Sequence, residues 1–174
     1  DETGDVVNYK IIIANNGNNS LVSLSLTDQM LAEGAYIIHI GTVDASGHFN
    51  ELNSLNTYQG LVNSDHRMVI VDSNGNSVTL NPNIALEFEY NYVYTTSDSN
   101  VKTGWYDNDL LRGGLENVSH VHDAKDGSKE SYSDDENHSN QEEGNALVNT
   151  VTVEANDLGT SRGEHASVSY NIGI

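Results

Sequence analysis

The sequence predicts an all-β protein, an antiparallel immunoglobulin-like β-sandwich in which residues 1–174 form a single domain with a long acidic loop insertion. Short runs alternate apolar and polar residues with a period of two, which is typical of half-buried strands. Clusters of Gly, Asn, Asp and Ser separate these runs, and helical periodicity is essentially absent. We therefore expect about seven to nine strands joined by turns.

Residues 4–28 contain the clearest strand pattern. Alternate positions from Val7 to Ile13 are apolar, and a second alternating run follows at 21–28. Between them, residues 15–18 (NNGN) tolerate positive φ and allow the chain to reverse without strain. The stretch predicts either a hairpin or a corner of the sandwich.

The later strands are expected in ranges bounded by turn residues. Residues 44–60 are predicted to be a polar loop, and residues 84–96 a long strand with an aromatic face. The other predicted strands lie at 34–43, 68–71, 77–80, 146–153 and 166–172.

The polar insertion spans residues 97–145 and is rich in Ser, Asp, Asn, Glu and Gly. Residues 129–144 have almost nothing to bury, and segments of this composition stay disordered unless something ties them down. We expect the insertion to supply ligand-binding or ion-binding loops.

The composition excludes several classes of function. With 26 acidic and 7 basic residues the net charge is −19, which argues against nucleic-acid binding and against attraction to anionic membranes. No apolar run approaches the roughly 18 residues of a membrane span. The charge has two open explanations: bound Ca²⁺, or a high-salt environment that screens repulsion.

Two turns are candidate calcium sites. Asp72, Asn74 and Asn76 place oxygen side chains at alternate positions around a glycine, although Asn-Gly is also a plain hairpin signal. Asp107 and Asp109 are spaced to converge on one ion.

The neighbours of the second turn are candidates for ligand binding, because Trp105 and Tyr106 are residue types that often line recognition surfaces. We therefore predict a ligand site formed by Trp105, Tyr106, Asp107 and Asp109. The alternative is that Trp105 packs on the sandwich and the aspartates are solvated. Asp5 and Asp28, which flank the first two predicted strands, are further candidate metal ligands.

The chain resembles the immunoglobulin-like conserved repeat domain of bacterial surface proteins and large calcium-dependent (RTX-type) adhesins. The resemblance is carried by residues 4–28, by Pro82 before the aromatic strand, and by the two last strands at 145–155, with Asn149, and 166–172. Within the first block the matching residues are Gly4, Asp5, Tyr9, Asn15, Gly17, Thr27 and Asp28. It implies an extracellular, cell-surface module beside neighbouring adhesin domains, without enzymatic activity. The chain departs from the family in its acidic insertion and in lacking Pro-Gly at 82–83.

Catalytic motifs are absent from the sequence: there is no Gly-x-Ser-x-Gly elbow, phosphate-binding glycine loop or His-Glu-x-x-His. We expect a non-catalytic module of a bacterial surface adhesin, stabilised by Ca²⁺, that binds a cell-surface peptide or glycan through its loops. The alternative is a structural spacer in which calcium serves only rigidity. A hydrolase with a pair of carboxylates is the remaining possibility.

Overall fold

The computed structural model describes residues 6–95, 98–107, 115–123, 129–132 and 141–173. Every regular element in this part of the chain is a β-strand, and every strand pair is antiparallel. The prediction of an all-β, antiparallel fold is confirmed. None of the described residues belongs to a helix long and apolar enough to cross a membrane.

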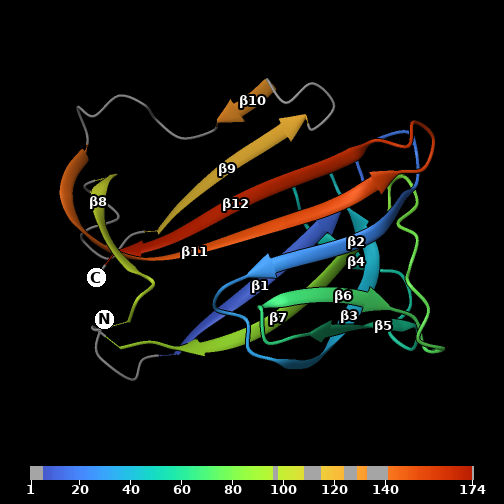
Figure 1. Cartoon of the computed structure of the whole chain (residues 1–174), viewed down its shortest axis with the longest axis horizontal. Helices are drawn as coiled ribbons and strands as arrows, with labels where there is room; N and C mark the ends of the chain where they lie inside the picture. The colour runs from blue at the N-terminus through green and yellow to red at the C-terminus, as the bar shows by residue number, and fades with distance from the viewer. Residues whose placement is uncertain (1–5, 96–97, 108–114, 124–128, 133–140, 174) are drawn as a thin grey trace.

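The strands form one sheet that curls into a half-barrel (Figure 1). Ten of them follow the hydrogen-bonded order β1-β7-β3-β5-β6-β2-β11-β12-β9-β10, while β4 pairs with β3 and β8 pairs with β11. The strands are β1 (Val6–Ala14), β2 (Leu21–Asp28), β3 (Gly34–Val43), β4 (Phe49–Glu51), β5 (Thr57–Val62), β6 (Arg67–Val71), β7 (Ala85–Val93), β8 (Val101–Asp107), β9 (Leu115–Asp123), β10 (Lys129–Tyr132), β11 (Gln141–Asp157) and β12 (Gly163–Gly173).

The core follows the alternation expected from the sequence. Tyr9 and Ile13 of β1 are buried, and on β7 the same holds for Leu86, Phe88 and Tyr90. Burying each such apolar side chain stabilises the fold by about 1.5–3 kcal/mol. The largest fully buried side chains include Phe88, Leu26, Leu31, Ile38, Met68, Leu80, Leu86 and Leu147.

The connection at residues 15–19 is a corner and not a hairpin. β1 pairs with β7, whereas β2 pairs with β6 and β11. Asn15 is buried and holds the corner: its Nδ2 donates to the carbonyls of Asn19 (2.8 Å) and Leu80 (2.9 Å). Its Oδ1 accepts from the Gly17 amide at 3.0 Å. The chain thus passes from one end of the curled sheet to its middle.

The expectation of a loop at 44–60 is wrong, because β4 and the start of β5 lie there. β5 does alternate, but one of its inward positions is Gly60, which hides the pattern in the sequence. A Cβ at Gly60 would lie 2.6 Å from the Met68 sulfur, so the Met68 side chain would have to move to make room for a larger residue. Residues 77–80 form only isolated bridges, Val71↔Ser77 and Leu21↔Leu80, where a strand was predicted.

The described parts of the polar insertion are strands that extend the sheet. β8 pairs with the first half of β11, β9 pairs with β12, and β10 pairs with β9. Backbone pairing thus ties β8 to β11 and β9 to β12, and Val101 of β8 also packs against the core.

Candidate functional site

β1 is an edge strand: among the described residues it pairs with β7 alone. Asn15, just beyond its end, directs both backbone groups toward the β7 side, since its amide donates to Ile84 (3.0 Å) and its carbonyl accepts from Asn83 (2.9 Å). Backbone groups of successive strand residues point to opposite sides. The amides and carbonyls of Lys10, Ile12 and Ala14 therefore face away from β7.

A first cavity lies beside the middle of β1. It has a volume of about 350 Å³ and is lined by residues 8–12 of β1, by Asn149 and Val151 of β11, and by Val168 and Tyr170 of β12. We call it the tyrosine cavity, because the ring of Tyr9 meets that of Tyr170 edge-on with centroids 6.5 Å apart.

Two buried polar atoms, on residues that line the tyrosine cavity, have no hydrogen-bond partner among the described residues. They are Oη of Tyr9, a residue that is 6% exposed, and Oδ1 of Asn149, which is 3% exposed. A buried polar group without a hydrogen bond costs about 1–3 kcal/mol and is rare in native proteins. These atoms mark a place where a polar ligand atom or an ordered water has partners to bind.

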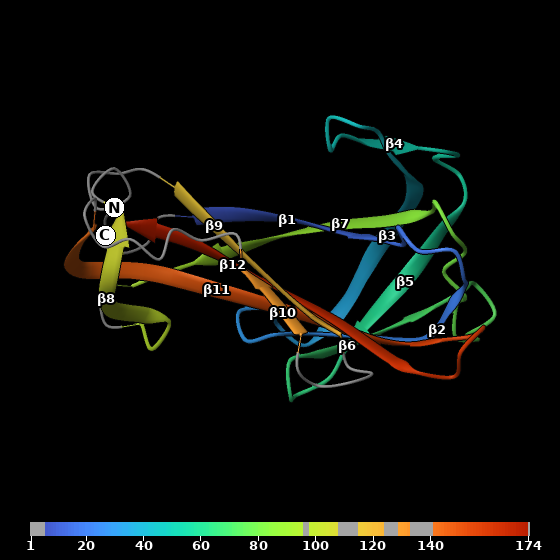
Figure 2. The same cartoon turned by 90° about the horizontal axis from the view of Figure 1, so that it is seen from above.

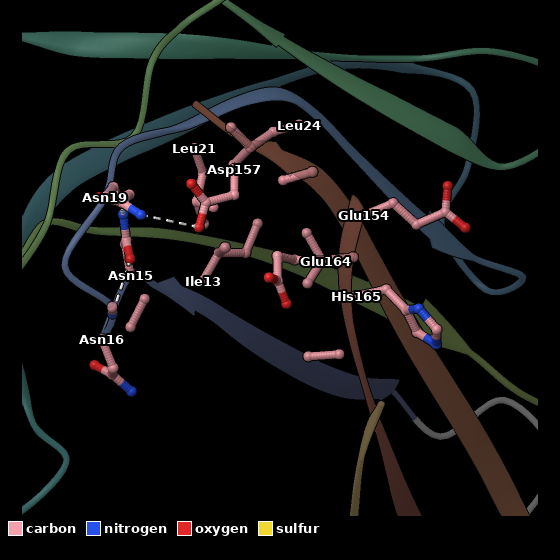
Figure 3. Close-up of a pocket in the computed structure, with 15 residues that line it drawn as sticks. Ile13, Asn15, Asn16, Asn19, Leu21, Leu24, Glu154, Asp157, Glu164 and His165 are labelled. Atoms are coloured by element: carbon pink, nitrogen blue, oxygen red, sulfur yellow. Dashed lines mark hydrogen bonds between the residues drawn. The ribbon is translucent and has the colours of Figure 1, made fainter. Parts of the chain in front are cut away.

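A second cavity, of about 390 Å³, lies at the end of β1 (Figure 3). Its apolar lining includes Ile13, Leu24 and Val153, and its acidic lining includes Asp157 and Glu164. Figure 3 shows the Glu164 carboxylate between Ile13 and His165, whereas the Glu154 side chain points away from Ile13. We call this the acidic cavity. The Glu164 carboxylate makes no hydrogen bond or ion pair within the part of the chain that the structure describes.

The two cavities lie end to end and share their walls. β1 forms one side of both, with residues 8–12 at the first cavity and residues from 13 onward at the second. The other wall is one face of the β11–β12 pair, whose facing residues are Asn149↔Tyr170, Val151↔Val168, Val153↔Ala166 and Ala155↔Glu164. Figure 2 shows β1 running alongside β11 and β12. We call the two cavities along β1 together the β1 groove.

A buried hydrogen-bond network lies behind the groove. The carboxylate of Asp28, 1% exposed, accepts hydrogen bonds from the Tyr90 hydroxyl and from the Met30 amide (2.9 Å). Burial raises the pKa of Asp28, and the hydrogen bonds from Tyr90, Met30 and Asn149 offset part of that rise. Burial and the charge of Asp28 also raise the pKa of Tyr90. The network joins β2, β7 and β11.

The network fixes the orientation of the Asn149 amide. Its Nδ2 donates to the Tyr90 hydroxyl at 2.8 Å and lies 3.4 Å from the Asp28 carboxylate. The Tyr90 hydroxyl donates its proton to Asp28. The Tyr90 oxygen and the Asp28 carboxylate can therefore only accept hydrogen bonds from Asn149. The Nδ2 group must therefore face the network, which leaves Oδ1 as the amide atom without a partner among the described residues.

Of the candidate calcium ligands, the structure describes Asp28 and the turn of Asp72, Asn74 and Asn76, where a calcium site stays a prediction. Asp72 is occupied by its own turn: its Oδ1 accepts from the amides of Asn74 (2.9 Å) and Asn76 (3.0 Å). Asp28 ends β2 and lies beside the start of β6, where its amide donates to the His66 carbonyl. Asp72 follows the other end of β6, so the two aspartates lie at opposite ends of that strand. Across the described residues no three acidic or histidine side chains are grouped to hold a metal ion.

The other predicted site residues fall in and beside β8. Trp105, Tyr106 and Asp107 have their backbone in this strand and pair with Glu143, Glu142 and Gln141 of β11. Their side chains lie outside the described part of the structure, as do Asp5 and Asp109. A calcium or ligand site at these residues stays a prediction.

Sequence reasoning missed the β1 groove. Tyr9 and Asn149 carried a signal as parts of the family motif, but only the fold brings them to one cavity. Comparison with family models, curated proteins and solved structures gave no match to this chain.

Proposed function

We propose that the chain is a non-catalytic binding module, with an immunoglobulin-like sandwich as its scaffold and the β1 groove as its ligand site. The observation that carries the proposal is the pair of unpartnered buried atoms, Tyr9 Oη and Asn149 Oδ1, in a cavity beside a free strand edge. Apolar concave sites with a few fixed polar groups are typical of ligand binding. The groove thus replaces the loops as the favoured site.

The charge state of Asp157 favours ion pairing over proton transfer by this carboxyl. Burial alone would raise the pKa of Asp157, but hydrogen bonds from the Thr160 and Gly159 amides outweigh it. A further hydrogen bond from Asn19 acts in the same direction, so the pKa of Asp157 is lowered and its carboxylate stays ionised at neutral pH. A general acid needs a pKa near the working pH, which this carboxyl lacks.

The setting that we propose is the surface of a bacterium, where the module would form part of an adhesin. Support comes from the resemblance of residues 4–28 to surface repeat domains and from the net charge of −19. Calcium belongs to the same proposal, because bound divalent cations would reduce the self-repulsion of so acidic a chain.

The groove assignment is tested by NMR titration of the isotope-labelled protein with a panel of oligosaccharides and peptides. We expect amide shifts to concentrate on β1, β11 and β12, and to vanish in Val168→Trp, which fills the tyrosine cavity. Val69→Trp is the matched control, because Val69 is exposed on β6. Shifts confined to other loops, or unchanged in Val168→Trp, would contradict the proposal. If no compound in the panel shifts any amide signal, the alternative of a structural spacer module is favoured.

A further inference from the structure

We infer that the occupant of the β1 groove is an extended peptide segment with a Lys or Arg side chain, which adds to β1 as a further strand of the sheet. This inference rests on the proposed function, since it names the ligand of the same groove. Three independent features of the groove support it: its backbone edge, the spacing of its cavities and its charge.

The backbone edge matches a polypeptide. The amides and carbonyls of Lys10, Ile12 and Ala14 face away from β7 and form a row of donors and acceptors at every second residue. An unpaired edge of this kind is a template for another strand, and peptide recognition by strand addition uses such main-chain hydrogen bonds for affinity. An oligosaccharide has no repeating amide and carbonyl to match that row.

The cavities match the side chains of an added strand. Alternate residues of a strand point to the same face, about 7 Å apart, so residues of one parity would face the groove. The tyrosine cavity adjoins residues 8–12 and the acidic cavity adjoins residues from 13 onward. Two side chains about four residues apart would therefore enter the two cavities.

The polar atoms decide which side chain enters the tyrosine cavity. Asn149 Oδ1 accepts only, while Tyr9 Oη both donates and accepts. An uncharged hydroxyl or amide side chain, as in Ser, Thr, Asn or Gln, satisfies both atoms. A cation is disfavoured there, because Lys10 lies on the same stretch of β1.

The acidic cavity fits a cation with an apolar stem. Asp157 and Glu164 supply negative charge beside Ile13 and Leu24, and long basic side chains bury an apolar stem while exposing a charged head. A second copy of this chain is the less favourable occupant, because each copy carries a net charge of −19. The groove thus favours an extended peptide that carries an uncharged polar residue and a basic residue about four positions apart, in either order.

The test selects binders from a display library of peptides of about ten residues and measures their affinities by calorimetry. We expect selected peptides to share a Lys or Arg, and its replacement by Glu to weaken binding about tenfold or more. In the protein, Ile12→Pro removes an outward amide at a position where an edge strand tolerates proline. It should weaken binding about tenfold more than Ile12→Thr does, since the Thr variant also replaces the side chain but keeps the amide.

Charge is tested by a matched pair of substitutions. Glu164→Gln should reduce the preference for Lys over Gln in the peptide, and Glu33→Gln, at an exposed acid that lines neither cavity, should leave it unchanged. Thermal unfolding of each variant verifies that the fold is intact.

Three outcomes would overturn the inference. If no peptide binds while an oligosaccharide still shifts the groove amides, the strand addition is wrong and the proposed function stands. If peptides bind equally well to Ile12→Pro and Ile12→Thr, the backbone edge is not used. If the protein dimerises through β1, as shown by sedimentation and its loss in Ile12→Pro, the edge serves self-association instead.

Discussion

Replacing Tyr90 by Phe isolates the contribution of the buried network. Phe keeps the ring that packs against Phe88 and Tyr9, so only the hydroxyl is lost. That hydroxyl donates to the Asp28 carboxyl, a bond of about 1.5–3 kcal/mol when the carboxyl is ionised, and accepts from Asn149, a bond of about 1 kcal/mol. We expect the free energy of unfolding at neutral pH to fall by about 2–4 kcal/mol.

The assay is thermal and urea unfolding of the wild type and the variant. For a chain of 174 residues, each kcal/mol shifts the melting temperature by about 2–4 °C, so the expected fall is roughly 5–15 °C. Tyr58→Phe is the matched control, since the Tyr58 hydroxyl makes no hydrogen bond with the described residues. Equal stability of the Tyr90 and Tyr58 variants would refute the reasoning.

The pH dependence of the same variant gives an independent measure. Because the pKa of Asp28 is raised in the folded state above its ordinary value of 3.8, the native protein holds that proton more tightly than the unfolded chain. The contribution of this bound proton to the free energy of unfolding is complete below the pKa of Asp28 in the unfolded chain. It is lost as the pH rises through the pKa of Asp28 in the folded protein. Losing the Tyr90 hydroxyl raises the folded pKa further. The free energy of unfolding of the variant should therefore be closest to that of the wild type in acid, and the difference should grow toward neutral pH.

Three further results are expected. Asn15→Ala removes the side-chain hydrogen bonds that hold the corner to Leu80, and should cost about 2–3 kcal/mol in urea unfolding; a loss under about 0.5 kcal/mol would contradict this. Gly41→Ala places a Cβ 2.2 Å from the Asn50 carbonyl, so β4 should detach, with loss of its amide protection in hydrogen exchange. Calcium should raise the melting temperature of chelator-stripped protein more than magnesium does at equal ionic strength, and Asp107→Ala should reduce the rise; equal rises would indicate screening alone.

The strands were predictable because their pattern is local. Tyr9, Ile13 and Phe88 occupy alternate positions that the sequence displays directly, whereas Gly60 conceals an inward position because it has no side chain to count. The polar insertion was predicted as loop, since its sequence shows no apolar period that would mark its strands.

The site was not predictable from local patterns. Asp28 ends its strand with the residue type and position expected of a metal ligand, but its partners Tyr90 and Asn149 lie 62 and 121 residues further along the chain. Only the sheet order brings them together. The groove depends in the same way on which strand pairs with β1, and no spacing in the sequence specifies that choice.

The position of β11 has a consequence for synthesis of the protein. Its second half pairs with β2, more than a hundred residues earlier, so the N-terminal strands leave the ribosome well before this partner exists. Until then one edge of β2 has no strand to pair with, and such edges recruit other chains. The negative charge of the chain makes nascent copies repel one another during this interval. The same net charge that keeps the folded protein soluble therefore also opposes association through the unpaired edge of β2.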